Sequence, residues 1–263
     1  MWVNVLGVLA GALLALLIGL LIGRVRSSPD DEGNSSAVGF VSAAVLGFFA
    51  LFAGFAVAGA WQELSDARSH TYEETRALTE AYWSARMLPA ADRPVVRQRL
   101  RAYTRQVIDE EWVQLGRGHG SAEAWASIDR VRVAAAAVRT ESPLEIAAKE
   151  DTLRSLEDVY ARRIARLADV DSRAPALELW GLVVGAVVVL FVPPLIGLTA
   201  DRRNLVLMGF MGASVAFAVG LVFQLSGPFD GTVRVGPTAF ELALTRYEQI
   251  DAGDGGVMGP PFP

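Results

Sequence analysis

The sequence has no cysteine and only two histidines among its 263 residues. The absence of cysteine excludes a disulfide framework, an iron–sulfur centre and a thiolate zinc site. Charged residues are also scarce, at 20% of the chain, whereas average globular proteins contain roughly 25%. The 24 basic and 29 acidic residues give a net charge of −5, so the chain has no basic field for binding nucleic acid.

The scarcity of charge is concentrated in four uncharged segments, which are residues 2–22, 37–61, 179–200 and 205–225. Each is longer than the roughly 18–20 residues that cross a bilayer core. The segments lack the alternation of period two that marks the strands of membrane barrels. The first has no basic residue before it and exceeds the length of a signal-peptide core, so it should remain attached. The sequence predicts an all-α membrane protein with four transmembrane helices.

Short loops join these helices in pairs, which gives two hairpins on either side of a longer insert. The predicted parts are a first hairpin (1–61), a helical extramembrane domain (62–178), a second hairpin (179–225) and a tail (226–263) that is disordered from about residue 251. The insert carries 18 basic and 20 acidic residues. Its nearly neutral, mixed charge indicates a water-exposed domain.

Helical signals run through the insert. No glycine or proline lies between Trp61 and Leu88, so the second transmembrane helix should continue beyond the membrane until Pro89 ends it. Helix caps are expected at Asp92, at Ser121 and in a capping box at Ser142. Two sets of apolar residues at helical spacing should face the core: Val96, Leu100, Tyr103 and Val107 in one helix, and Ile146, Leu153, Leu156, Tyr160, Ile164, Leu167 and Val170 in another.

Ionisable residues are absent from the predicted spans, which argues against a proton-coupled pump. His70 and Glu74 are four residues apart on one helix, a spacing that predicts a surface ion pair. The three acids from Asp109 to Glu111 should be solvated, with a weak divalent-cation site as the alternative. The chain has no serine–histidine–acid set and no phosphate-binding loop. We therefore expect no enzymatic activity, no cofactor and no resident metal.

The second span carries an aromatic face. Phe48, Phe52 and Phe55 lie at positions i, i+4 and i+7, so they share one side of the helix, whereas Phe40 and Phe49 lie off it and should pack against other helices. The shared face has two interpretations: it packs against helices or lipid, or it forms apolar rings that gate a pore by dewetting. Glycine pairs at spacing four, such as Gly181 and Gly185, indicate close helix packing within the chain.

Several short motifs resemble the bacterial bestrophin-like domain family, a group of four-span membrane proteins. They are the run from Ala37 to Trp61-Gln-Glu-Leu, Leu88-Pro89, Arg99 to Tyr103, Glu110-Glu-Trp112, Gly227-Pro-Phe-Asp-Gly231 and Val235-Gly-Pro-Thr-Ala-Phe240. The family positions within these motifs are Trp61, Pro89, Tyr103, Trp112, Pro228, Phe229, Gly231, Pro237 and Phe240.

The family is distantly similar to true bestrophins, which are pentameric ion channels whose second span lines a narrow neck. The resemblance implies a homo-oligomer, expected to be a pentamer, that lies in the lipid bilayer of the cell membrane and conducts inorganic ions. Anion selectivity is inherited from the resemblance alone. The acidic calcium clasp of animal bestrophins should not be carried over, because Asp230 is the only acid between Asn204 and Phe240.

Orientation and function leave alternatives open. Seven arginines flank the insert and tail and four lie in the short loops, which favours a cytoplasmic insert, as does the resemblance. The short loops taken alone favour the opposite orientation. The alternative to a channel is a non-conducting membrane scaffold or sensor whose helical domain binds a protein partner.

Overall fold

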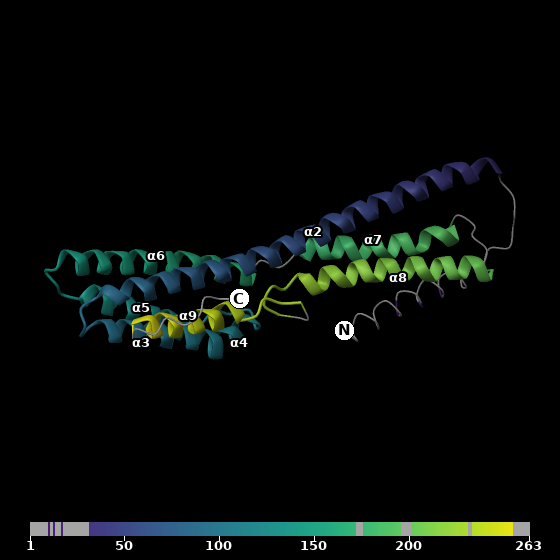
Figure 1. The fold of residues 1–263 in the computed structure, drawn as a ribbon. Helices are drawn as coiled ribbons and strands as arrows, with labels where there is room; N and C mark the ends of the chain where they lie inside the picture. Colours follow the sequence, from purple (N-terminus) through teal and green to yellow (C-terminus); the bar gives the residue numbers. More distant parts are fainter. Residues whose placement is uncertain are drawn as a thin grey trace. The chain divides into compact units, whose positions relative to one another are not determined.

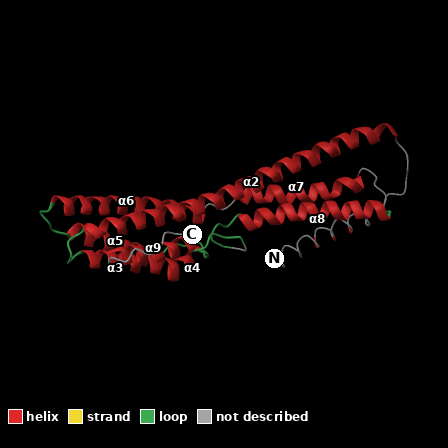
Figure 2. Ribbon diagram, in the orientation of Figure 1, coloured by secondary structure: helices red, strands yellow, loops and turns green. Residues whose placement is uncertain are grey.

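The computed structural model describes most of the chain in four stretches. They are residues 32–171, 176–195, 201–230 and 233–254, together with the single residues Ala10, Leu13 and Leu17. Within these residues every regular element is helical and no strand occurs (Figure 2). The all-α part of the prediction is confirmed. The first predicted span lies outside the described residues apart from the three single positions, so the count of four spans stays a prediction.

The helices follow one another with short connections (Figure 1). Their bounds are α2 Glu32–Ser84, a 3₁₀ turn η1 Ala85–Met87, α3 Arg93–Gln106, a π-helical turn η2 Val107–Glu111, α4 Trp112–Leu115, α5 Ala122–Ala137, α6 Pro143–Asp171, α7 Ala176–Leu195, α8 Arg202–Leu225 and α9 Thr238–Asp254.

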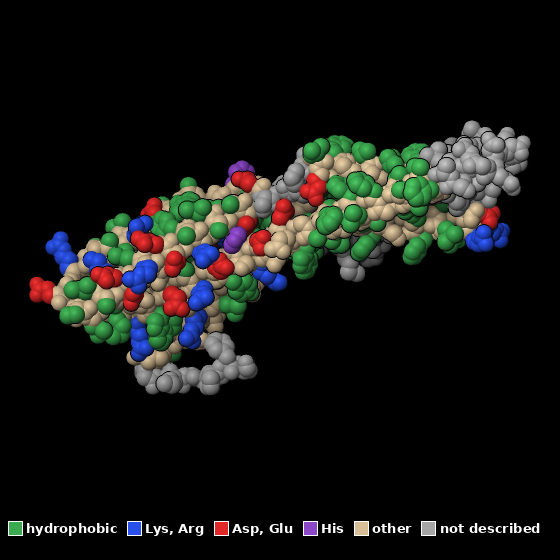
Figure 3. All heavy atoms as spheres, turned by 90° about the horizontal axis from the view of Figure 1, so that it is seen from above, with side chains coloured by type: hydrophobic (Ala, Val, Ile, Leu, Met, Phe, Trp, Pro, Cys, Tyr) green, Lys and Arg blue, Asp and Glu red, His purple; other side chains and the backbone are tan. Residues whose placement is uncertain are grey.

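The chain forms two compact units. We call the first the apolar unit; it comprises the chain up to Glu63, Arg173–Gly227 and Gly231–Val233. The second, the charged unit, comprises Leu64–Ser172, Pro228–Asp230 and the chain from Arg234 onward. Helix α2 contributes to both units, and α9 from the predicted tail belongs to the charged unit. Figure 3 shows acidic and basic side chains gathered over the charged unit and hydrophobic side chains along the apolar unit.

Helices α2, α7 and α8 pack together in the apolar unit. Their shared core consists of small and aliphatic side chains with one aromatic ring: Phe49, Ala53, Ala56, Leu182, Ala186, Val189, Val215 and Val222. Among the described residues, two helical stretches are long and apolar enough to cross a membrane, Gly39–Met87 and Arg202–Leu225, and α7 adds the shorter apolar stretch Leu177–Val192. By length and composition these helices fit a membrane protein.

The charged unit has a larger core, built from the end of α2 and from α3, α5, α6 and α9. The predicted apolar face of α3, from Val96 to Val107, is completely buried in it. Helix α2 does continue beyond its uncharged segment, and it ends at Ser84 in the turn η1. Leu88 is extended, as expected for a residue that precedes a proline.

One of the three predicted caps is present. The Ser121 hydroxyl accepts a hydrogen bond from the Ala124 N–H and begins α5. Asp92 precedes α3 without a side-chain cap, because its backbone is already helical. The capping box at Ser142 is not formed: Glu145 accepts a hydrogen bond from Thr140, whose hydroxyl oxygen also accepts the Ser142 N–H.

Two further expectations need correction. The buried line of α6 is formed by Ala148, Thr152, Leu156, Val159, Arg163, Arg166 and Val170. It is rotated from the predicted stripe, so Ile146 and Ile164 are exposed. The disorder predicted from residue 251 does not begin there, because α9 continues to Asp254. Ion pairs from Asp251 and Asp254 to Arg97 hold this last turn.

Candidate functional site

The aromatic face of α2 divides into two environments. Phe48 and Phe55 are 74% and 68% exposed, and Phe40, which was expected to pack, is also exposed. Phe52 is half-buried and packs against the apolar core. The structure therefore keeps Phe48 and Phe55 together on the outer side of α2 and turns Phe52 toward its neighbours.

Glycines on α7 let the inner phenylalanines approach. A Cβ added at Gly185 would lie 3.1 Å from the buried Phe49 ring, and one at Gly181 would lie 3.5 Å from the Phe52 ring. The glycine pair is thus occupied within the chain, which is the packing role expected from its spacing. A groove of about 320 Å³ lies beside these rings, and the exposed Phe48 is also part of its lining.

A buried ionic network occupies the centre of the charged unit. Arg163 and Arg166 of α6, Glu74 of α2 and Glu111 of η2 are completely buried. Arg163 donates to both Glu111 oxygens at 2.7 and 2.5 Å. The Arg166 guanidinium donates to Glu74 at 2.7 Å and to Glu111 at 3.0 Å, so it links the two acids. The Tyr103 hydroxyl donates to Glu74 at 2.6 Å. Two cations and two anions therefore neutralise each other.

Burial and ion pairing have opposite effects on the pKa of Glu111, one of the two acids in this network. Burial alone would raise the pKa of the Glu111 carboxyl, but the Arg166 and Arg163 guanidiniums outweigh it, so the pKa lies below its ordinary value. Burial raises the pKa of the Tyr103 hydroxyl, and the Glu74 carboxylate raises it further. The network is sealed and keeps fixed charges, which suits a structural role and not proton transfer.

The network corrects two predictions. His70 and Glu74 do not form the surface ion pair expected from their spacing, because Glu74 points inward to Arg166 while His70 Nδ1 lies 2.9 Å from Asp169. The acidic run is not uniformly solvated either, since Glu111 is buried while Asp109 and Glu110 are exposed. Among the described residues no cluster of acids and histidines is arranged to hold a metal ion.

Several of the family-motif residues meet around Trp112. Its indole N–H donates to the Val235 carbonyl at 3.2 Å, and its ring makes edge contacts with Phe229 and Phe240. Two backbone hydrogen bonds hold the segment in place: Val235 N–H donates to the Pro228 carbonyl, and Phe240 N–H donates to the Pro237 carbonyl in a turn at the start of α9. The motif after α8 therefore anchors the chain to the charged unit.

The remaining motif residues lie elsewhere. Tyr103 belongs to the ionic network, Trp61 is 60% exposed on α2, and the Pro89 carbonyl accepts the turn hydrogen bonds before α3. Gly231 lies outside the described residues.

The sequence matches the family model described as the Bestrophin-like domain over residues 9–240, which is most of the chain. The chain belongs to the Bestrophin-like family. The resemblance drawn from the short motifs is thereby confirmed, and the grouping around Trp112 is a structural feature of this family member.

The fold is similar to that of a bestrophin homologue. The crystal structure of a point mutant of a bacterial bestrophin homologue from Klebsiella pneumoniae matches with a TM-score of 0.64 and 15% sequence identity. The match covers 96% of this chain and 99% of that chain. Among curated proteins, none matches the sequence. At this identity the similarity establishes the bestrophin fold.

Proposed function

We propose that this Bestrophin-like protein is an oligomeric ion channel of the cell membrane, in which α2 lines an apolar neck. Family membership supports the general class. The observation that carries the neck is the exposure of Phe48 and Phe55, at 74% and 68%. Two large aromatic rings seven residues apart project from the side of α2 that the core of the apolar unit leaves uncovered.

The surroundings of these rings are uncrowded. A Cβ placed on Gly47 or Gly54, which neighbour Phe48 and Phe55 on α2, meets no atom within 4 Å. In a closed ring of identical subunits, each copy would contribute one Phe48 and one Phe55 at the axis. Two stacked apolar rings would result, and a narrow apolar constriction excludes water and gates by dewetting. Phe52 would support the neck from behind, through its contact with Gly181.

The proposal takes the remaining features from the resemblance. The assembly is a pentamer, the charged unit is cytoplasmic, and the permeating species is an inorganic ion, with anions as the inherited expectation. Calcium gating through an acidic clasp is not included, because Asp230 is the only acidic residue in the segment between α8 and α9.

Ion flux in liposomes under reversed salt gradients tests the channel, and a matched set of variants tests the neck. Replacing both Phe48 and Phe55 with alanine should widen and wet the neck, so flux rises while thermal stability is retained. Phe52→Ala should instead remove a packed ring and cost roughly 2 kcal/mol, about half the value for a fully buried phenylalanine, without a rise in flux.

Two results would contradict the proposal. A correctly assembled wild-type protein that passes no ion under either gradient would exclude the channel and favour a scaffold or sensor. A double variant that loses stability without gaining flux would show that Phe48 and Phe55 pack between subunits and do not line the neck.

A further inference from the structure

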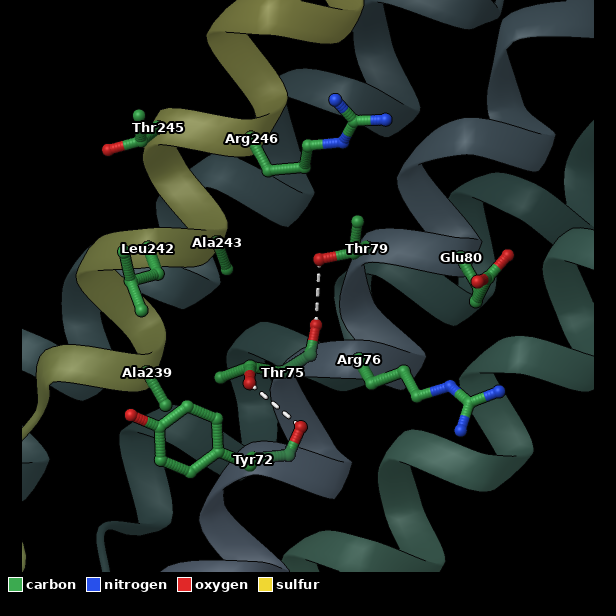
Figure 4. A pocket seen from close by; sticks show the side chains of 10 residues that line it. All are labelled: Tyr72, Thr75, Arg76, Thr79, Glu80, Ala239, Leu242, Ala243, Thr245 and Arg246. Carbon is green, nitrogen blue, oxygen red and sulfur yellow. Dashed lines mark hydrogen bonds between the residues drawn. The ribbon is translucent and has the colours of Figure 1, made fainter. Parts of the chain in front are cut away.

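A groove runs between α2 and α9 in the charged unit. Its main cavity, of about 420 Å³, has Tyr72 and Thr79 of α2 on one side and Leu242 and Arg246 of α9 on the other (Figure 4). A second hollow of about 310 Å³ shares Thr79 and Arg246 with the first and extends the groove to Trp83. The groove therefore follows α9 from its beginning to its last turns.

The lining combines apolar side chains with charged ones, which are Arg76, Arg246 and Glu80. Tyr72, Trp83 and Leu242 are 45%, 46% and 54% exposed, whereas Tyr82, Tyr103 and Tyr247 of the same unit are buried. The hydroxyls of Thr75 and Thr79 donate to carbonyls within α2, so they require no outside partner. The groove thus offers two aromatic surfaces, an aliphatic one, the guanidiniums of two arginines and the carboxylate of Glu80.

The end of α9 lies at the Trp83 end of this groove. Asp254 pairs with Arg97 at 2.7 Å and also with Arg86. The Arg86 guanidinium lies over the Trp83 ring, 5.4 Å from its centre. The last described residue of the chain is therefore held beside the aromatic residue that closes the groove.

The sequence that follows has the composition of a groove ligand. After Gly255 and Gly256, the chain continues as Val-Met-Gly-Pro-Pro-Phe-Pro, residues 257–263, which lie outside the described residues. Proline-rich segments adopt the polyproline II conformation and dock in aromatic-lined grooves at a low entropy cost. Such a segment has unpaired carbonyls, and the guanidiniums of Arg76 and Arg246 can donate to them.

The segment of residues 257–263 is long enough to follow the groove. Seven residues in polyproline II conformation span about 22 Å at 3.1 Å each. The α9 positions along the groove, from Ile250 back to Ala239, extend over about 17 Å at 1.5 Å per residue. Gly255 and Gly256, which separate the helix from this segment in the sequence, permit the backbone conformations that a reversal of direction requires.

We propose that residues 257–263 fold back and bind in the α2–α9 groove of the same chain. Phe262 and the prolines contact Tyr72, Leu242 and Trp83, and the segment runs antiparallel to α9. This intramolecular docking site is independent of the channel proposal, because it rests only on the charged unit and the sequence that follows it.

Cysteine cross-linking tests the docking directly, because the chain contains no cysteine of its own. In the full-length protein, Gly259→Cys is combined with Thr245→Cys in the groove or with Glu248→Cys as the matched control. Glu248 is exposed and lies on the opposite side of α9 from the groove. The control pair is closer in sequence, so a segment that does not dock should close it at least as fast.

Docking should make the Thr245 pair form its disulfide at least about tenfold faster than the Glu248 pair, since binding raises the local concentration of the segment. Replacing Tyr72 and Trp83 with alanine in the groove pair should remove that advantage, and an unchanged helical circular dichroism spectrum confirms that the variant is folded. Equal rates for the two pairs would overturn the proposal. Disulfide-linked dimers in place of an internal bond would also overturn it, because they would assign the groove to a neighbouring copy's segment.

Discussion

The apolar unit and the charged unit bury opposite kinds of side chain. The core of the apolar unit is aliphatic apart from the buried ring of Phe49, whereas the charged unit encloses two arginines and two glutamates without solvent exposure. In the apolar unit the large side chains lie mostly outside: only 17% and 22% of the most apolar stretches of α2 and α8 are buried within the chain. The two units are therefore stabilised by different surroundings.

This difference indicates whether each unit is stabilised by its own core alone or also needs surroundings that cover its exposed apolar side chains. A helix that exposes phenylalanine and valine presents an apolar surface that lipid or another subunit can cover, so under the proposed function the membrane and the assembly complete the fold of the apolar unit. The charged unit is complete in its own core, but its ionic network tolerates little change. Removing one member of a buried pair leaves an uncompensated charge in a medium that solvates it poorly.

The largest expected effect comes from breaking the network at Arg166. Arg166→Met leaves Glu74 without its guanidinium and Glu111 with Arg163 alone, and it should destabilise the protein by about 3–5 kcal/mol. Thermal unfolding of the purified protein, followed by circular dichroism, measures the loss.

Arg162→Met is the matched control on the same helix. Arg162 is half-exposed and pairs with the partly exposed Glu73, so its removal should cost no more than about 1 kcal/mol. If both variants unfold at the same temperature, the buried network does not distinguish the charged unit from an ordinary charged surface.

The residues of the network show what the sequence could reveal. Glu111 follows Leu100 by eleven positions, about three helical turns, which places it on the face that was correctly predicted to be buried. Arg163 and Arg166 each lie seven positions after a buried apolar residue, Leu156 and Val159. Glu111 and Arg163 thus align with residues that were predicted to be buried, whereas Arg166 aligns with Val159, which lay outside the predicted stripe. In each case periodicity cannot identify the partner of the charge.

Tertiary packing determines which charged side chains pair with each other. Glu74 meets Arg166 across 92 positions of sequence, and neither residue carries a local signal for the other. The spacing of His70 and Glu74 indicated a local pair instead, which proved wrong because α6 offers both residues better partners. Helix type, the α3 face and the Ser121 cap were predictable, since each depends on residues close in sequence.

Protonation of Glu111 is a weaker perturbation of the same network. The pKa of Glu111 is lowered in the folded protein. Its carboxylate therefore contributes fully to stability above pH 4.5, the ordinary pKa of a glutamate, and this stabilisation is lost as the pH falls toward the lower pKa of the folded state. The wild-type unfolding temperature should decrease over this acid range.

Glu111→Gln isolates that contribution. The variant should be less stable than the wild type at pH 7, and the difference should narrow as the pH falls below 4.5, because the wild type then loses the same charge. A difference that stays constant from pH 7 to pH 3 would show that the carboxylate charge of Glu111 does not stabilise the charged unit.

The smallest effect concerns the caps of two helices in the charged unit. Ser121→Ala removes the hydroxyl that accepts the Ala124 N–H and should cost about 1 kcal/mol. The backbone of Ser121 keeps its hydrogen bonds to Glu111 and Arg163, so the ionic network stays intact. The loss then reports the two hydrogen bonds of the hydroxyl, the one from Ala124 and the one that it donates to Glu123. Asp92→Ala is the comparison, since Asp92 occupies the same position before α3 without a side-chain cap. It should lose only a few tenths of a kcal/mol, from the weakened interaction of its charge with the helix dipole. Unfolding temperatures measured side by side separate the two, and equal losses would mean that the Ser121 hydrogen bond contributes no more than a nearby charge.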